Sequence, residues 1–124
     1  MEQKKVLIID DDARNIFALK AVLRSRGIPC ISASSGAEGL ALLDNAHEVG
    51  VVLMDIMMPD MDGYETIAAL RAKEGESHLP IIAVTAKAMV GDREKCLEAG
   101  ADNYISKPVD VDVLLSQLQQ YLFV

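Results

Sequence analysis

Cysteine is scarce in this chain of 124 residues, which contains only Cys30 and Cys96. The two cysteines stand far apart in the sequence and form no C-x-x-C pair. This spacing argues against a zinc site or a redox pair, and it favours two buried apolar thiols.

Positive charge is also in short supply, with 12 lysines and arginines against 19 aspartates and glutamates and a net charge of -7. An acidic domain repels the phosphate backbone of nucleic acids and the anionic headgroups of lipids. We therefore expect no direct nucleic-acid binding and no direct membrane contact.

Long hydrophobic runs and several familiar motifs are missing. The apolar run at 6–9 ends at three aspartates, which is too short for a signal peptide or a membrane span, so we expect a cytoplasmic protein. The sequence contains no P-loop, no G-x-G-x-x-G loop and no G-x-S-x-G elbow. An EF-hand register with Gly63 at its sixth position fails because Met58 and Ala69 stand where acidic residues are needed.

Short apolar runs alternate with segments of helical period along the whole chain. The runs at 6–9, 49 with 51–54, and 81–84 indicate buried strands, and 30–33 and 103–106 are weaker candidates. Helical spacing of leucine and isoleucine between and after these runs predicts five βα units. Parallel strands with right-handed crossovers then predict one α/β domain over 1–124, a doubly wound five-stranded parallel sheet of flavodoxin-like order 2-1-3-4-5.

Acidic residues follow two of the predicted strands. Asp10, Asp11 and Asp12 come directly after the first strand, and Asp55 ends the third. In this strand order the two strands are neighbours, so their carboxylates converge where ligands bind in such sheets. Oxygen ligands of this kind suit Mg²⁺. Asp12 and Asp10 have an alternative role as favourable charges at a helix N-terminus, and Asp55 as a loop cap.

Three residues at strand ends suggest phosphoryl chemistry. Asp55 is suited to be a carboxylate nucleophile, with Lys107 as a positive charge opposite it and the Thr85 hydroxyl as a donor to a phosphoryl oxygen. Taken alone, Lys107 is also compatible with an ordinary surface lysine and Thr85 with a residue that satisfies backbone groups. The methionines around Asp55, including Met57, are best interpreted as packing residues.

Four ordered motifs carry a resemblance to a known family. They are V-L-I-I-D-D-D at 6–12, V-L-M-D-I-M-M-P-D-M-D-G at 52–63, A-V-T-A at 83–86 and Y-I-S-K-P at 104–108. Together they resemble the receiver domain of two-component response regulators over nearly the whole chain. The segment that begins at Thr85 is most similar to the receivers of hybrid sensor histidine kinases.

The resemblance implies a role for each matching residue. Asp55 would be the phosphoacceptor, and Asp10 and Asp11 would be the acidic pair that binds Mg²⁺ with Asp55. The further roles are metal binding through a backbone carbonyl (Met57), switching (Thr85 and Tyr104), phosphate contact (Lys107) and control of the phosphoryl lifetime (Met57 and Lys87).

The implied function is a phosphoacceptor switch and not a conventional enzyme. The phosphoryl group would come from a histidine kinase or a histidine phosphotransfer protein, and it would bias the surface of the fourth helix, fifth strand and fifth helix. One alternative is a pseudo-receiver that binds partners without phosphorylation. Another is an aspartyl-phosphate phosphatase, but Met57 and Pro59 interrupt the required D-x-D-x-T pattern.

Overall fold

The structure is a computed structural model of the chain, and it describes residues 4–45, 48–58, 62–73, 78–86 and 91–122. Strands and helices alternate along the described residues, as the sequence pattern predicts. In chain order they are β1 (Lys5–Ile9), α1 (Ala13–Ser25), β2 (Cys30–Ala33), α2 (Gly36–Asn45), β3 (Val49–Asp55), α3 (Gly63–Lys73), β4 (Ile81–Thr85), α4 (Asp92–Ala99), β5 (Asn103–Ser106) and α5 (Val111–Leu122).

The strands form one parallel sheet in the order β2-β1-β3-β4-β5, which confirms the predicted doubly wound topology. β3 lies at the centre and is buried along its whole length, as expected for an apolar strand covered on both faces. Ile9 of β1 pairs with Met54 of β3, and Asp55 pairs with Val84 of β4. This register brings the residues that follow β1, β3 and β4 to one edge of the sheet.

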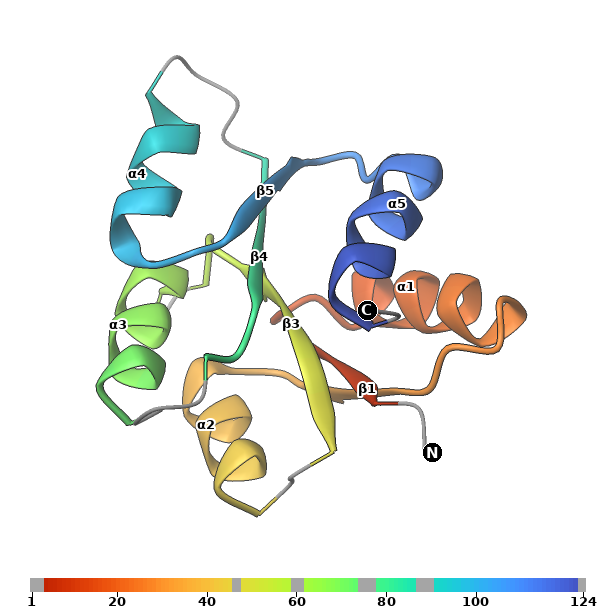
Figure 1. Cartoon of the computed structure of the whole chain (residues 1–124), viewed down its shortest axis with the longest axis horizontal. Coiled ribbons are helices and arrows are strands. Elements are labelled where there is room, and N and C mark those ends of the chain that lie inside the picture. The colour runs from red at the N-terminus through yellow and green to blue at the C-terminus, as the bar shows by residue number, and fades with distance from the viewer. Residues whose placement is uncertain (1–3, 46–47, 59–61, 74–77, 87–90, 123–124) are drawn as a thin grey trace.

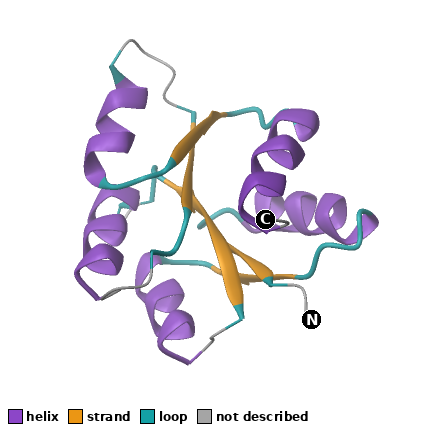
Figure 2. Cartoon of the chain, in the orientation of Figure 1, coloured by secondary structure: helices purple, strands orange, loops and turns teal. Residues whose placement is uncertain are grey.

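Helices cover both faces of the sheet, with α1 and α5 on one side and α2, α3 and α4 on the other (Figure 1). Figure 2 shows the strands as a central layer between these two groups of helices. Successive residues of β1 serve the two faces alternately, because Leu7 belongs to the core beneath α2–α4 and Ile8 to the core beneath α1 and α5. The sheet therefore has a separate packed core on each face, and these two cores support its edge.

Glycine and aspartate residues occupy the ends of several helices. Gly27 and Gly100 have φ values of 73° and 120° at helix ends, a conformation that glycine adopts without a steric penalty. Asp110 accepts a hydrogen bond from the Asp112 amide at the start of α5. Cys96 is fully buried, but Cys30 is only half-buried, so the expectation of two buried thiols is correct for Cys96 alone. Among the described residues, no helix has the length and apolar character needed to cross a membrane.

Candidate functional site

Three carboxylates meet at the carboxyl edge of the sheet. Asp10 follows β1, Asp55 ends β3, and both side chains are buried, with 3% of each residue exposed. Asp11 lies beside them and is exposed. One oxygen from each of the three carboxylates lies within 4.8 Å of the others. The structure thus confirms the convergence that the strand order predicts, in a spacing that one cation could bridge.

Asp12 belongs to the helix and not to this cluster. Its carboxylate accepts a hydrogen bond of 2.9 Å from the Arg14 amide and caps the N-terminus of α1. The Asp12 amide in turn donates to Asp10 Oδ1 at 2.9 Å. The helix-capping role is therefore correct for Asp12. Asp10 instead faces the cluster, and the hydrogen bond from the Asp12 amide holds its carboxylate there.

Lys107 places a single positive charge among the carboxylates. Its Nζ lies 3.4 Å from Asp55 Oδ1 and 3.5 Å from Asp10 Oδ2. The Lys107 amide donates to the Thr85 carbonyl oxygen at 2.8 Å, which fixes the backbone of the lysine to the end of β4. Lys107 is thus part of the cluster and not an ordinary surface lysine. We call Asp10, Asp11, Asp55 and Lys107 the acidic site.

Charge in the acidic site is only partly balanced. The pKa of Asp55 is raised from 3.8 to about 6, mainly by burial and in second place by the nearby Asp10 carboxylate. Lys107 and the Met57 amide, which donates to Asp55 Oδ1 at 3.2 Å, act in the opposite direction but do not restore the ordinary value. The lysine contacts are longer than the about 2.7–2.9 Å of strong charge-assisted hydrogen bonds. The site therefore gains stability from an added cation.

Thr85 and Tyr104 lie on two neighbouring strands, β4 and β5. Thr85 is 1% exposed and lies at the end of β4, one residue beyond the partner of Asp55 in the register. Tyr104 in β5 is partly buried against the core beneath α2–α4. Burial raises the pKa of Tyr104, with smaller contributions from Cys96 and Asp92, both in α4. Thr85 thus lies at the acidic site and Tyr104 lies next to α4.

The methionines near Asp55 divide into two kinds. Met54 and Met58 are buried, as packing residues should be, but Met57 is 51% exposed, so the packing interpretation is wrong for Met57. Its side chain stands at the surface next to Asp55. Lys87, the other residue expected to control the phosphoryl lifetime, lies outside the described residues.

Two residues near the acidic site have importance that the sequence analysis missed. A Cβ at Gly63 would lie 2.6 Å from Ile56 Cα and 2.7 Å from the Asp55 carbonyl oxygen, so a larger residue would displace the backbone next to Asp55. Asn15 lies in the first turn of α1 and lines a pocket together with Asp10 and Lys107. The D-G pair hints at a turn but not at this close approach, and nothing in the sequence places Asn15 beside the β5–α5 connection.

Comparisons with known proteins point in one direction. A profile of the response regulator receiver domain matches residues 6–119. The polar-differentiation response regulator DivK of Brucella abortus is 36% identical over 119 residues, which cover 96% of each chain. A hybrid signal transduction histidine kinase I of Dictyostelium discoideum is 38% identical over 133 residues, which cover 98% of this chain. The chain spans only 8% to 14% of the length of the histidine kinases that it matches first.

A solved structure agrees with these matches. It is the receiver domain of a sensor histidine kinase from Pseudomonas aeruginosa PAO1, with a magnesium ion coordinated in its active site cleft. The two chains are 32% identical and superpose with a TM-score of 0.87. The match covers 99% of the present chain and 100% of the Pseudomonas aeruginosa chain.

Proposed function

We propose that this chain, which belongs to the response regulator receiver domain family of two-component systems, accepts a phosphoryl group on Asp55. Members of this family are signalling switches and not conventional enzymes. The observation that carries the assignment is the position of Asp55, a buried carboxylate at a strand end with Lys107 Nζ 3.4 Å away. This arrangement holds a nucleophile and a phosphate-binding charge side by side.

The proposed donor is a phosphohistidine of a histidine kinase or a histidine phosphotransfer protein. A carboxylate oxygen of Asp55 forms a bond to phosphorus while the bond from phosphorus to the imidazole nitrogen breaks. The electron pair of the broken bond returns to that nitrogen, and the product is an acyl phosphate on Asp55. Lys107 stabilises the charge on the phosphoryl oxygens, and the Thr85 hydroxyl is placed to donate to one of them.

Mg²⁺ fits the acidic site, because three carboxylate oxygens within 4.8 Å of one another are the hard ligands that it prefers. In the proposal Asp10, Asp11, Asp55 and the main-chain carbonyl of Met57 would hold it. When bound, the ion supplies positive charge that offsets the negative charge of the carboxylates and of the phosphoryl group. The magnesium ion in the similar Pseudomonas aeruginosa receiver supports this assignment.

Phosphorylation is proposed to act as a two-state switch. The acyl phosphate adds about two negative charges at the edge of the sheet. Thr85 would move toward that charge and Tyr104 would turn inward, which changes the surface formed by α4, β5 and α5. Burial of Thr85 at the acidic site and the position of Tyr104 against α4 support a path between the two regions.

The proposal treats residues 1–124 as one receiver domain that works in the cytoplasm. All described strands belong to one sheet, which supports the single domain. Both a stand-alone regulator and a module of a hybrid histidine kinase fit the matches, because DivK is covered almost completely and the kinases only in small part. The complete acidic site favours phosphorylation over a pseudo-receiver role.

Incubation with acetyl phosphate and Mg²⁺ tests the assignment directly. Intact-mass measurement should show the gain of one phosphoryl group in the wild type and none in Asp55→Asn, which keeps the shape of the side chain but loses the nucleophile. Asp12→Asn is the matched control: it changes the neighbouring acid, retains a helix cap and should be modified normally.

Other results would replace the proposal. Absence of any modification in the wild type would support the pseudo-receiver, and rapid continuous release of phosphate would support an enzyme. A phosphoryl group found on Asp55→Asn would place the acceptor elsewhere in the chain.

A further inference from the structure

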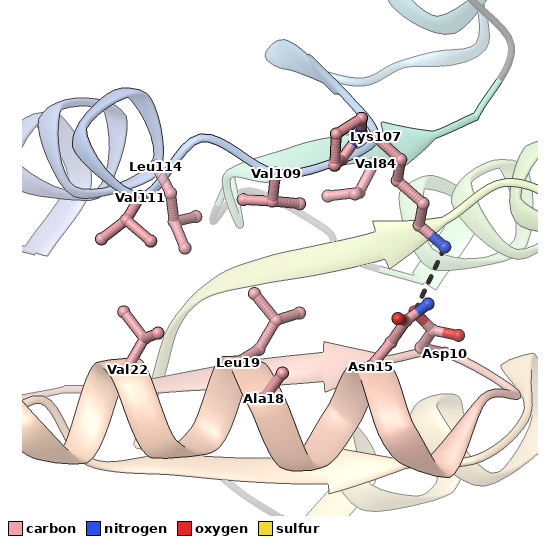
Figure 3. Close-up of a pocket in the computed structure, with 11 residues that line it drawn as sticks. Asp10, Asn15, Ala18, Leu19, Val22, Val84, Lys107, Val109, Val111 and Leu114 are labelled. Carbon is pink, nitrogen blue, oxygen red and sulfur yellow. Dashed lines mark ion pairs between the residues drawn. The ribbon is translucent and has the colours of Figure 1, made fainter.

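A pocket of about 280 Å³ lies between α1 and α5 and reaches the acidic site (Figure 3). We call it the α1–α5 pocket. It is lined by Asp10, Asn15, Ala18, Leu19, Val22, Val84, Lys107, Pro108, Val109, Val111 and Leu114. Figure 3 shows that the polar side chains gather at one end, whereas Val22 and Leu114 face each other at the other end. The pocket thus has an apolar body and a charged end.

The apolar body sets the size and character of a ligand. Leu19 and Val22 of α1 face Val109 and Leu114 across the pocket, with Val84 of β4 also in its lining. The volume falls just below the about 300–1,000 Å³ that is typical of sites for drug-sized ligands, so the pocket suits a smaller molecule. Each methylene group that leaves water for such a lining gains up to about fourfold in affinity. A short alkyl chain therefore fits the body.

The charged end sets the sign of the ligand. Lys107 Nζ lies 3.5 Å from Asp10 Oδ2 and 3.4 Å from Asp55 Oδ1, so one ammonium group is shared between two buried carboxylates. Asp11 adds a third carboxylate to the same cluster. Asp10 and Lys107 line this end of the pocket, and Asp11 and Asp55 lie next to them in the acidic site. The three negative groups of the acidic site outnumber its one positive group, so the field at this end favours a second cation over an anion.

We propose that the α1–α5 pocket binds a small organic monocation, a primary ammonium on a short apolar chain, with its ammonium beside the Asp10 carboxylate. The alkyl chain lies between Leu19 and Leu114. The alkyl chain thus contacts the apolar lining of the pocket, and the ammonium meets the negative charge that Lys107 leaves unbalanced.

This site is linked to the proposed metal site, and that part of the inference rests on the proposed function. Asp10 belongs to both, so the ammonium and Mg²⁺ compete for the same negative charge. A divalent ion balances the acidic site and removes the attraction for a second cation. The organic cation therefore binds the metal-free chain preferentially and opposes phosphorylation.

Three probes of equal chain length test the charge preference: hexylammonium, hexan-1-ol and hexanoate. Each is titrated into the unphosphorylated protein, and the methyl signals of Leu19, Val22 and Leu114 are followed by NMR. We expect hexylammonium to bind about fivefold more tightly than hexan-1-ol, and hexanoate to bind most weakly. Saturating Mg²⁺ should weaken hexylammonium binding about fivefold, to the affinity of hexan-1-ol, and leave hexan-1-ol binding unchanged.

A pair of variants on α1 tests the location. Both Ala18 and Ala21 are exposed residues of α1, but Ala18 lines the pocket and Ala21 does not. Ala18→Phe fills the pocket and should abolish binding of hexylammonium and hexan-1-ol, while Ala21→Phe should bind both like the wild type. Mg²⁺ affinity should stay unchanged in both variants, because neither residue belongs to the acidic site.

Two results would overturn the inference. Equal affinity for the three probes would remove the charge preference, and unchanged binding to Ala18→Phe would place the probes elsewhere. Failure of Mg²⁺ to bind the wild type would instead count against the proposed function, since the probe titrations in metal-free buffer do not depend on the metal.

Discussion

Asp102 and Asp55 lie at opposite edges of the same sheet, and each has a basic side chain beside it. Asp102 Oδ2 accepts bonds of 2.9 Å from Arg71 Nη2 and 2.8 Å from the Ile81 amide, and its Oδ1 lies 2.6 Å from His78 Nε2. Asp55 has Lys107 at 3.4 Å and a second buried carboxylate, Asp10, as a neighbour. Short hydrogen bonds therefore neutralise the charge of Asp102, whereas the charges of Asp55 and Asp10 are only partly neutralised.

The difference assigns the two edges to different tasks. Asp102 lies at the amino edge, the edge formed by the amino ends of the strands. There Arg71 also donates to the carbonyl oxygens of Gly100 and Leu79. Its guanidinium therefore joins α3, the start of β4 and the turn before β5. Such a matched network holds elements together. At the carboxyl edge, a metal ion would balance the charge of Asp55, and a phosphoryl group would be balanced by the charge of Lys107. The same residue types therefore support the fold at one edge and, in the proposed function, bind ligands at the other.

The largest expected effect on stability comes from breaking the network at the amino edge. Arg71→Met removes the guanidinium from the Asp102 carboxylate and from the carbonyl oxygens of Gly100 and Leu79. We expect the free energy of unfolding to fall by about 3 kcal/mol in urea titrations. Lys73→Met is the matched control in the same helix: it removes an exposed pair with Asp44 and should cost less than about 0.5 kcal/mol. Equal losses would contradict the assignment of a structural role to Arg71.

At the carboxyl edge, removal of a charge should raise the free energy of unfolding instead of lowering it. Folding raises the pKa of Asp55 from 3.8 to about 6, so the folded chain binds this proton more tightly than the unfolded chain. The wild type therefore loses stability relative to Asp55→Asn as the pH rises from about 4 to about 6. At neutral pH without metal, we expect Asp55→Asn to be the more stable protein by about 2 kcal/mol.

Urea titrations of both proteins at about pH 3 and at neutral pH measure this difference. The gap should close at the acidic pH, which lies below both pKa values, so that the carboxyl group is mostly protonated in the folded and the unfolded chain. A difference that is the same at both pH values would show that burial of the Asp55 charge does not destabilise the folded chain.

Removal of one exposed acid should weaken metal binding at the same edge. Asp11→Ala deletes a carboxylate of the acidic site without opening the core, because Asp11 is exposed. We expect Mg²⁺ affinity and the rate of phosphorylation by acetyl phosphate to fall together by about tenfold. Asp12→Asn again serves as the control. Full-rate phosphorylation of the wild type in excess chelator would contradict the role of the metal.

A smaller effect is expected on the lifetime of the phosphoryl group. Hydrolysis needs a water molecule opposite Asp55, and the exposed Met57 side chain can shield that approach but cannot orient the water by hydrogen bonding. We predict that Met57→Asn and Lys87→Glu change the rate of dephosphorylation severalfold. The decay of the phosphorylated species without a partner measures it, and indistinguishable rates in all variants would exclude control at these positions.

Local patterns predicted the skeleton of the molecule but not its tertiary contacts. Apolar runs followed by Asp10 and ended by Asp55 identify both the sheet and the edge where the acids meet. The alternation of strands and helices is a property of short segments, and the rules for parallel crossovers then restrict the strand order. Arg71 and Asp102 are 31 residues apart, and each resembles an ordinary surface charge in the sequence. The exposure of Met57 and the pocket beside Asn15 likewise depend on how separate elements pack, which no local pattern contains.

The claim that the carboxyl edge holds unneutralised charge can be tested most directly by an NMR titration of the Asp55 side-chain carboxyl carbon in metal-free protein. The structure predicts a pKa of about 6, because burial and the Asp10 carboxylate both disfavour ionisation. The same titration with saturating Mg²⁺ should move the pKa well below that value, since a bound cation favours the ionised form. A pKa near 3.8 without metal, unchanged by Mg²⁺, would contradict the account.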